Sequence, residues 1–274
     1  MKKKFLLAIP ARLKSERLPN KIIADISGKS MLEHVLLRCQ KVQRDVEIVV
    51  CTDSLEICNL CEKLSFKFLL TSTECTSGTE RIASVIKDLI AICWQKNTEE
   101  LNQESFLKHL KSTIIINVQG DQPLLDPKII EQLIDIYLNR LNPPDVLTPI
   151  YKLGGNSVHN PNIVKTLISH KNKVIYFSRS PLPFLRDVKP EDWHEFCSYW
   201  GHVGIYGFVG NILNDWFNLP DSPLEKFEKL EQLKLIEAGI EIETFIVNNE
   251  TISVDTLEQL NYVKKIINNQ KNIF

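Results

Sequence analysis

Short apolar runs rich in β-branched residues alternate with helical periods through the first half of the chain, and this alternation constrains the fold most strongly. Between the runs, Ser30 and Glu33 form a capping box ahead of an apolar stripe, Asp126 followed by Pro127 begins another helix, and a further helical period runs over residues 82–93. Strands that alternate with helices are typical of a parallel sheet covered by helices. We therefore predict an α/β fold with parallel strands at 5–9, 46–51, 67–70 and 113–118.

The pattern changes in the second half of the chain. Two strand-like runs, 163–169 and 174–178, flank a short polar turn, which predicts an antiparallel hairpin. No repeat or linker divides the chain, and 274 residues of which 43% are hydrophobic can bury a substantial core. We expect one domain over residues 1–274, mostly parallel, with a smaller antiparallel lobe within roughly 146–235. The polar stretch 95–112 is expected to be a surface excursion without chemistry.

Charge and cysteine content restrict the partners and the compartment. The chain has 33 Lys and Arg against 34 Asp and Glu, so nothing favours nucleic acid or an anionic membrane as a partner. The basic start precedes an apolar run that is too short for a signal peptide, and no stretch is long enough to span a bilayer. Seven cysteines lack the spacing of a disulfide framework, and the C-x-x-C at Cys58 and Cys61 is better explained by apolar packing than by redox or metal chemistry. We expect a cytoplasmic protein with reduced thiols.

The loop after the first predicted strand concentrates positive charge. Arg12, Lys14, Arg17 and Lys21 lie within ten positions of one another, together with Ser15. Ligands of an open parallel sheet bind outside the carboxyl ends of its strands, and Arg and Lys are suited to phosphate oxygens. The loop lacks a glycine-rich phosphate fingerprint, so a solvated basic loop is the alternative.

Two acidic residues are candidate metal ligands. Asp121 follows the predicted strand 113–118 and lies beside Gly120, where a carboxylate would suit Mg²⁺, although it could merely cap the turn. Asp255 lies between a predicted strand at 240–247 and the last predicted helix, which it is well placed to cap. Asp255 becomes a metal ligand only if the fold brings it to Asp121.

Nine short segments occur in the order typical of one enzyme family. Together they cover nearly the whole chain: IPARLKSERLPNK (9–21), TSGTER (76–81), NVQGD (117–121), NPNIVK (160–165), YFSR (176–179), HVGIYG (202–207), SPLE (222–225), LEQL (230–233) and VDT (254–256). The chain thereby resembles the 3-deoxy-manno-octulosonate cytidylyltransferases. The resemblance implies a three-layer nucleotide-diphospho-sugar transferase-like fold, a homodimer, and a need for CTP, magnesium and a sugar acid. It also implies transfer of CMP from CTP to the anomeric hydroxyl of 3-deoxy-D-manno-octulosonate, with release of pyrophosphate, for lipopolysaccharide synthesis.

The resemblance also implies roles for individual residues. The implied nucleotide-binding residues are Arg12, Ser15, Lys21, Thr76, Ser77, Gly78, Arg81 and Gln119. The implied sugar-binding residues are Arg179, His202, Tyr206, Glu231 and Gln232, the implied metal ligands Asp121 and Asp255, and the implied catalytic residues Lys21, Asp121 and Asp255. Apart from the resemblance, His202 could be a core histidine, but Tyr206 has the same strand parity and is expected to point to the same face.

A few positions depart from the family pattern. Asn20 stands where glycine is usual and should tolerate a positive φ. Cys75 and Gln122 replace the usual histidine and glutamate beside the proposed site. These two changes leave an 8-amino-3,8-dideoxy-octulosonate open as the sugar, although other segments keep the commoner form and favour the ordinary one.

Two further functions are alternatives. A sialic-acid cytidylyltransferase would share the nucleotide, metal and fold, but the hairpin and the segment around His202 argue against it. An inactive nucleotide-binding regulator is disfavoured by the intact set of phosphate and metal residues, since a dead relative has no use for it.

Overall fold

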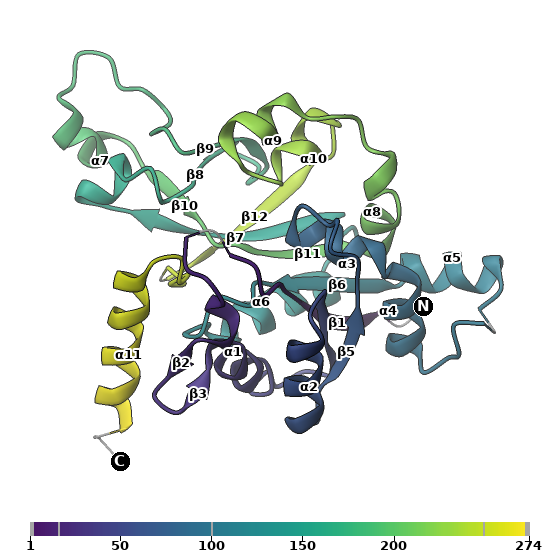
Figure 1. Ribbon diagram of the computed structural model, residues 1–274. Helices are drawn as coiled ribbons and strands as arrows, with labels where there is room; N and C mark the ends of the chain where they lie inside the picture. The colour runs from purple at the N-terminus through teal and green to yellow at the C-terminus, as the bar shows by residue number, and fades with distance from the viewer. Residues whose placement is uncertain (1–2, 16, 100, 249, 272–274) are drawn as a thin grey trace.

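The computed structural model describes residues 3–15, 17–99, 101–248 and 250–271 of the chain. Within these residues, ten strands form one mixed sheet in the order β5-β4-β1-β6-β11-β7-β10-β8-β9, with β12 beside β7 (Figure 1). The strands of this sheet are β1 (Lys4–Ala11), β4 (Val46–Thr52), β5 (Lys67–Leu70), β6 (Thr113–Val118), β7 (Val146–Leu153), β8 (Lys165–Ile168), β9 (Val174–Ser178), β10 (Tyr199–His202), β11 (Ile205–Val209) and β12 (Ile242–Val247). A separate two-stranded sheet pairs β2 (Asp25–Ile26) with β3 (Lys29–Ser30).

Helices surround this sheet and connect its strands. They are α1 (Met31–Cys39), α2 (Leu55–Lys63), α3 (Gly78–Ser84), α4 (Ile86–Trp94), α5 (Gln103–Lys111), α6 (Pro127–Asn139), α7 (Trp193–Phe196), α8 (Gly210–Asn214), α9 (Pro223–Glu228), α10 (Leu233–Glu237) and α11 (Leu257–Lys271). Four 3₁₀ turns are described as well, η1 (Lys21–Ile23), η2 (Gly155–His159), η3 (Pro190–Asp192) and η4 (Trp216–Asn218). Among the described helices, none has the length and apolar composition of a membrane span.

The parallel part of the sheet is buried on both faces, which gives the fold three layers. Side chains of β1 alternate between two core clusters: Leu7 and Ile9 pack with α1 and α6, whereas Leu6 and Ala8 pack with α3 and α4. A strand covered on both faces is an almost continuous apolar run. The four predicted parallel strands and the three-layer α/β fold are confirmed.

The antiparallel strands extend the same sheet. β11 pairs with β6 and places Tyr206 opposite Asn117, and the predicted hairpin is confirmed as β8 and β9. β12 joins this part of the sheet, parallel to β7, from outside the predicted range 146–235. The two halves of the chain therefore meet along the boundary between β6 and β11.

Capping side chains mark the starts of several helices. The side chain of Ser30 accepts a hydrogen bond from the Glu33 amide at the start of α1, and Asp126 caps α6 in the same manner. Asn20 has a φ of 55°, as expected for a left-handed residue in place of glycine. The predicted helical period over 82–93 is interrupted at Val85, where α3 ends and α4 begins.

One expectation about the fold was incomplete. The stretch 95–112, expected to be a surface excursion, contains the helix α5. Asn102 caps this helix through its side chain, and Leu110 packs with Leu101 against Ile90 of α4. Leu101 and Leu110 are buried in a segment that is mostly polar, so its low overall hydrophobicity did not indicate a helix.

Candidate active site

The candidate site lies where β1 and β6, which are parallel neighbours, reach the same edge of the sheet. The loop after β1 brings Lys21 to this edge, and its Nζ donates to Asp121 Oδ2 at 2.6 Å and to Asp255 Oδ1 at 2.8 Å. Arg17 Nη2 lies 2.9 Å from the same Asp255 oxygen. Glu16, which belongs to the family segment 9–21, lies outside the described residues. The structure therefore brings the three implied catalytic residues together.

A backbone contact places Asp255 beside Asp121. The amide of Val254 donates to the main-chain oxygen of Asp121 at 2.9 Å, and the Val254 side chain is buried in a core cluster with α11. Asp255 does not cap α11 through its carboxylate: Thr256 and Gln259 form the cap, with Gln259 Oε1 accepting from the amides of residues 255 and 256. The alternative of a purely capping Asp255 is wrong, since its carboxylate contacts Lys21 and Arg17.

Lys21, Arg17, Asp121 and Asp255 form a charged cluster in which one carboxylate oxygen lacks a partner among the described residues. Burial lowers the pKa of Lys21, but attraction and hydrogen bonding by Asp121 and Asp255 outweigh this effect and raise it above its ordinary value, so the ammonium stays charged. Asp121 Oδ1 is buried and has no hydrogen-bond partner among the described residues. A buried carboxylate oxygen without a partner is costly unless a ligand satisfies it. Two carboxylates with such an oxygen fit Mg²⁺, a hard cation that prefers oxygen ligands.

The implied nucleotide residues surround the end of β1. Arg12 and Ser15 lie in the loop after this strand, where Arg12 is exposed. Gly78 begins α3 so close to the end of β1 that a Cβ would lie 3.0 Å from Pro10 Cγ and 3.5 Å from Gln119 Oε1. Glycine therefore favours the close approach of α3 to the strand end, because a side chain would require Pro10 or α3 to shift.

The neighbouring residues of this segment have local partners. Ser77 caps α3 by accepting from the Glu80 amide at 3.1 Å, and Thr76 donates its amide and its hydroxyl to the Glu80 carboxylate. Arg81 is 2% exposed, and its guanidinium contacts Asp53 at 2.8 Å and Thr71. These contacts hold the start of α3 against the end of β4, and direct contact of Arg81 with a nucleotide stays a prediction.

The rings of His202, Tyr206 and Phe177 lie together in the antiparallel part of the sheet. The His202 ring lies 5.1 Å from Tyr206 and 5.0 Å from Phe177, measured between ring centroids. The expectation from strand parity is wrong, because the chain turns at Val203 and Gly204 and places the two residues on different strands, β10 and β11. Their rings are nevertheless neighbours.

His202 is neutral. Thr148 Oγ1 lies 2.9 Å from His202 Nε2 and 2.8 Å from the main-chain oxygen of Ile205. Burial lowers the pKa of His202 to about 3. A neutral His202 offers no positive charge to an anionic substrate.

Glu231 and Arg179 are also fixed by contacts. Glu231 accepts from the Thr79 hydroxyl at 2.8 Å and from the Thr79 amide at 3.2 Å, which joins the implied sugar side to the implied nucleotide side. Arg179 Nε donates to the main-chain oxygen of Glu228 at 2.9 Å, and Nη1 donates to that of Pro161 at 3.2 Å. Gln232 is buried beside Glu231. Among the described residues, no hydrogen bond or ring contact joins Arg179 to His202 or Tyr206.

Comparison with known proteins identifies the family to which this chain belongs. The model of a cytidylyltransferase family matches residues 6–242. A 3-deoxy-manno-octulosonate cytidylyltransferase of Wolinella succinogenes is 36% identical, over 95% of this chain and 98% of its own length, and the one of Chlorobium limicola is 33% identical over 96% of each. The chain belongs to the 3-deoxy-manno-octulosonate cytidylyltransferase family. A solved CMP:2-keto-3-deoxy-manno-octonic acid synthetase in complex with CTP superposes with a TM-score of 0.82 at 31% identity, over 98% of this chain and 100% of that one.

The two departures from the family pattern lie near the site. Cys75 is buried, with its sulfur 3.9 Å from Ser84 Oγ. Gln122 is 2% exposed; its Nε2 lies 3.4 Å from Ser253 Oγ, and its Oε1 is buried without a partner among the described residues. Gln122 therefore leaves an unsatisfied acceptor next to Asp121.

Two buried polar residues, Asn117 and Lys165, were missed as candidates by sequence reasoning. Asn117 and Thr79 connect Gln119 to Glu231 by hydrogen bonds. Lys165 is fully buried, and its Nζ donates to the main-chain oxygens of Asn160, Ile163 and Arg179. Asn117 had a signal, since it is a polar residue within the apolar run 114–118. The partners of Thr79 and Lys165 are set by the tertiary fold.

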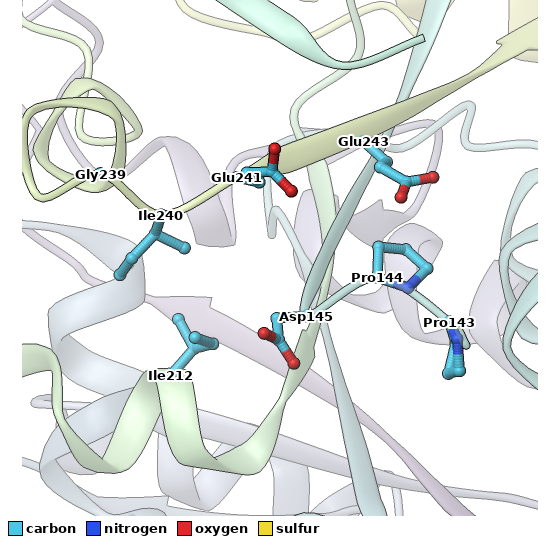
Figure 2. Close-up of a pocket in the computed structure, with 8 residues that line it drawn as sticks. All are labelled: Pro143, Pro144, Asp145, Ile212, Gly239, Ile240, Glu241 and Glu243. Atoms are coloured by element: carbon cyan, nitrogen blue, oxygen red, sulfur yellow. The ribbon is translucent and has the colours of Figure 1, made fainter. Parts of the chain in front are cut away.

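A surface pocket of about 450 Å³ lies apart from the candidate site (Figure 2). It is lined where β7 and β12 begin, by Pro143, Pro144, Asp145, Ile212, Gly239, Ile240, Glu241 and Glu243. None of the implied site residues lines it. Its carboxylates would repel a triphosphate, and Glu241 and Glu243 are paired with Lys173 and Arg140. The pocket is therefore not a candidate for the nucleotide site.

Proposed function

We propose that this protein transfers CMP from CTP to the anomeric hydroxyl of 3-deoxy-D-manno-octulosonate and releases pyrophosphate. The observation that carries the proposal is the meeting of Lys21, Asp121 and Asp255 at the common end of β1 and β6. The relatives named for this reaction match nearly the whole chain, and the solved synthetase of similar structure was obtained with CTP. The alternatives of a sialic-acid enzyme and of an inactive regulator have no such support.

The reaction requires positioning and charge neutralisation more than covalent chemistry. The sugar hydroxyl attacks the α-phosphorus of CTP in line, and the bond from that phosphorus to the bridging oxygen of pyrophosphate breaks. Lys21 and Arg12 would offset negative charge that develops on the leaving pyrophosphate. Arg179 keeps its Nη2 donors for the sugar carboxylate, while its Nε and Nη1 are held by main-chain oxygens.

Magnesium is the expected cofactor of this site. Asp121 and Asp255 would hold it, since they already converge and Asp121 Oδ1 has no partner among the described residues. When bound, the ion neutralises charge on phosphate oxygens and acts as a Lewis acid. No third acidic, histidine or cysteine side chain joins the pair within the described part of the chain.

We also propose a compartment, a pathway and an oligomeric state for this enzyme. We expect a cytoplasmic enzyme whose product serves lipopolysaccharide synthesis, and the seven cysteines, all free thiols, suit a reducing compartment. We also expect a homodimer. Phe184 and Phe196, 74% and 70% exposed near the antiparallel strands, are apolar enough to support a contact between copies.

A pyrophosphate-release assay tests the proposal. The purified protein is mixed with CTP, magnesium and one sugar acid at a time: 3-deoxy-D-manno-octulosonate, its 8-amino form or a sialic acid. We expect turnover with the octulosonate, loss of turnover when EDTA is added, and recovery with excess magnesium. Turnover with the sialic acid alone would contradict the choice of sugar, and full activity in EDTA would contradict the metal assignment.

A further inference from the structure

A chain of hydrogen bonds crosses the site from Gln119, after β6, to Glu231, before α10. Gln119 Nε2 donates to Asn117 Oδ1 at 3.1 Å, and Asn117 Nδ2 donates to Thr79 Oγ1 at 3.1 Å. Thr79 then donates its hydroxyl to Glu231 Oε1 at 2.8 Å. Thr79 and Asn117 are 1% and 0% exposed, so water does not compete for these bonds.

The carboxylate end fixes the direction of this chain. An ionised carboxylate only accepts hydrogen bonds, so Thr79 gives its single hydroxyl hydrogen to Glu231 and can only accept from Asn117. Asn117 must then turn its nitrogen to Thr79 and its oxygen to Gln119. Gln119 must in turn direct its nitrogen inward, and a flip of either amide would set two donors or two acceptors against each other.

The outward group of Gln119 is therefore its oxygen. A Cβ added to Gly78 would lie 3.5 Å from Gln119 Oε1 and 3.0 Å from Pro10 Cγ, so this oxygen lies beside the start of α3, near the end of β1. Gln119 is half-buried, and no described residue donates to its Oε1. The oxygen is a free acceptor at the place where the implied nucleotide and sugar residues meet.

We propose that Thr79 and Asn117 are positioning residues that hold Gln119 with its side-chain oxygen toward a bound substrate. The substrate group at this position must carry an O–H or N–H. A hydroxyl or amino group of the nucleotide and a hydroxyl of the sugar acid share this chemistry. The inference rests on the proposed function, which supplies both substrates.

A double-mutant cycle tests whether Thr79 acts through Gln119. KM is measured for CTP and for the sugar acid in wild type, Thr79→Val, Gln119→Ala and the double variant. We expect Thr79→Val to raise one of the two KM values about tenfold, which is the worth of one well-placed hydrogen bond. The double variant should be no worse than Gln119→Ala alone, because the Thr79 effect disappears once Gln119 is absent. The KM that changes identifies the substrate that contacts Gln119.

A conservative variant separates positioning from a general loss of packing. Thr79→Ser keeps the hydroxyl and should stay within about threefold of wild type in both KM values. Additive effects in the cycle, or a Thr79→Ser variant as impaired as Thr79→Val, would overturn the inference.

Calorimetric titration with CTP and with the sugar acid accompanies the kinetics. A wild-type protein that binds these ligands without turnover would contradict the proposed function. The same cycle, measured on the Kd values, would then decide the inference separately.

Discussion

Two clusters of charged residues follow parallel strands of this protein, and they are balanced in different ways. Arg81 pairs through Nη2 with Asp53, which follows β4, and its Nη1 donates to Thr71 Oγ1 and to the main-chain oxygen of Ser72. Near the end of β6, the carboxylates of Asp121 and Asp255 share Lys21. The second cation, Arg17, has a side chain that is 63% exposed. Asp121 Oδ1 has no hydrogen-bond partner among the described residues. A satisfied pair stabilises the fold, whereas an unsatisfied group is a place for a ligand.

The largest expected effect is on turnover, at the unsatisfied cluster. Asp121→Asn should lower kcat by about 100-fold or more, because it removes charge that acts on the transition state, and should change the Kd for CTP far less. The unfolding free energy should change less than turnover does, since Lys21 keeps Asp255 as a charged partner. Steady-state kinetics, CTP titration and urea unfolding measure the three quantities.

A matched substitution controls for the loss of any carboxylate. Asp187 is exposed and lies 3.7 Å from Arg186 on the surface, and its φ of 63° suits asparagine. Asp187→Asn should therefore leave both turnover and stability unchanged. Wild-type turnover in Asp121→Asn would remove this residue from the catalytic set.

The next effect is on stability, at the satisfied pair. Arg81→Met should lower the unfolding free energy by about 3 kcal/mol, because it leaves Asp53 without its cation in a largely buried position. The KM for CTP should stay within about twofold of wild type, since the guanidinium is engaged by the protein. Urea unfolding and kinetics at low temperature give the two values.

A second variant tests whether the pair or the single arginine matters. Combining Arg81→Met with Asp53→Leu removes both charges and should recover much of the lost stability. A tenfold rise in KM for CTP in stable Arg81→Met would instead make Arg81 a nucleotide ligand, as the resemblance implies.

Between pH 8 and 10, the pH dependence of stability should come mainly from buried thiols. Burial raises the pKa of the Cys39, Cys51, Cys61 and Cys93 thiols to about 12. Above pH 9 the unfolded chain loses these protons and the folded chain keeps them, so the unfolding free energy falls as the pH rises toward 12. Each thiol contributes up to about 1.4 kcal/mol per pH unit.

One buried lysine acts in the opposite direction. Burial lowers the pKa of Lys165 to about 8, so between pH 8 and its ordinary value near 10.5 the unfolded chain holds more protons and stability rises. Four thiols outweigh one lysine, and we expect a net fall above pH 9. Urea midpoints at pH 8, 9 and 10 measure it. Cys61→Ala should reduce the slope and Cys197→Ser should not, whereas a flat profile would contradict the assignment.

The sequence predicted the features that depend on neighbouring residues. The parallel strands followed from apolar runs, and the starts of α1 and α6 followed from the caps at Ser30 and Asp126. The contact that makes the site was not predictable from spacing, because the Val254 amide reaches Asp121 across 133 positions of sequence. The partner of Arg81 was missed for the same reason: Asp53 lies after another strand, and only the order of strands in the sheet brings the two together.

The smallest expected effect is at Ser77, where a substitution distinguishes capping of α3 from binding of the nucleotide. Ser77 is an implied nucleotide residue, but its hydroxyl caps α3 by accepting from the Glu80 amide at 3.1 Å. Ser77→Ala should lower the unfolding free energy by about 1 kcal/mol and raise the KM for CTP less than threefold, since the cap already occupies the hydroxyl oxygen.

Ser30 supplies the matched control for this cap. It caps α1 by accepting from the Glu33 amide at the same 3.1 Å, in a capping box of the same spacing, and it is not among the implied site residues. Ser30→Ala should therefore cost the same stability and leave KM unchanged. If Ser77→Ala raised the KM for CTP tenfold while the two variants lost equal stability, the Ser77 hydroxyl would serve the nucleotide as well as the helix. The Ser77 side chain would then be both a structural group and a ligand-binding group.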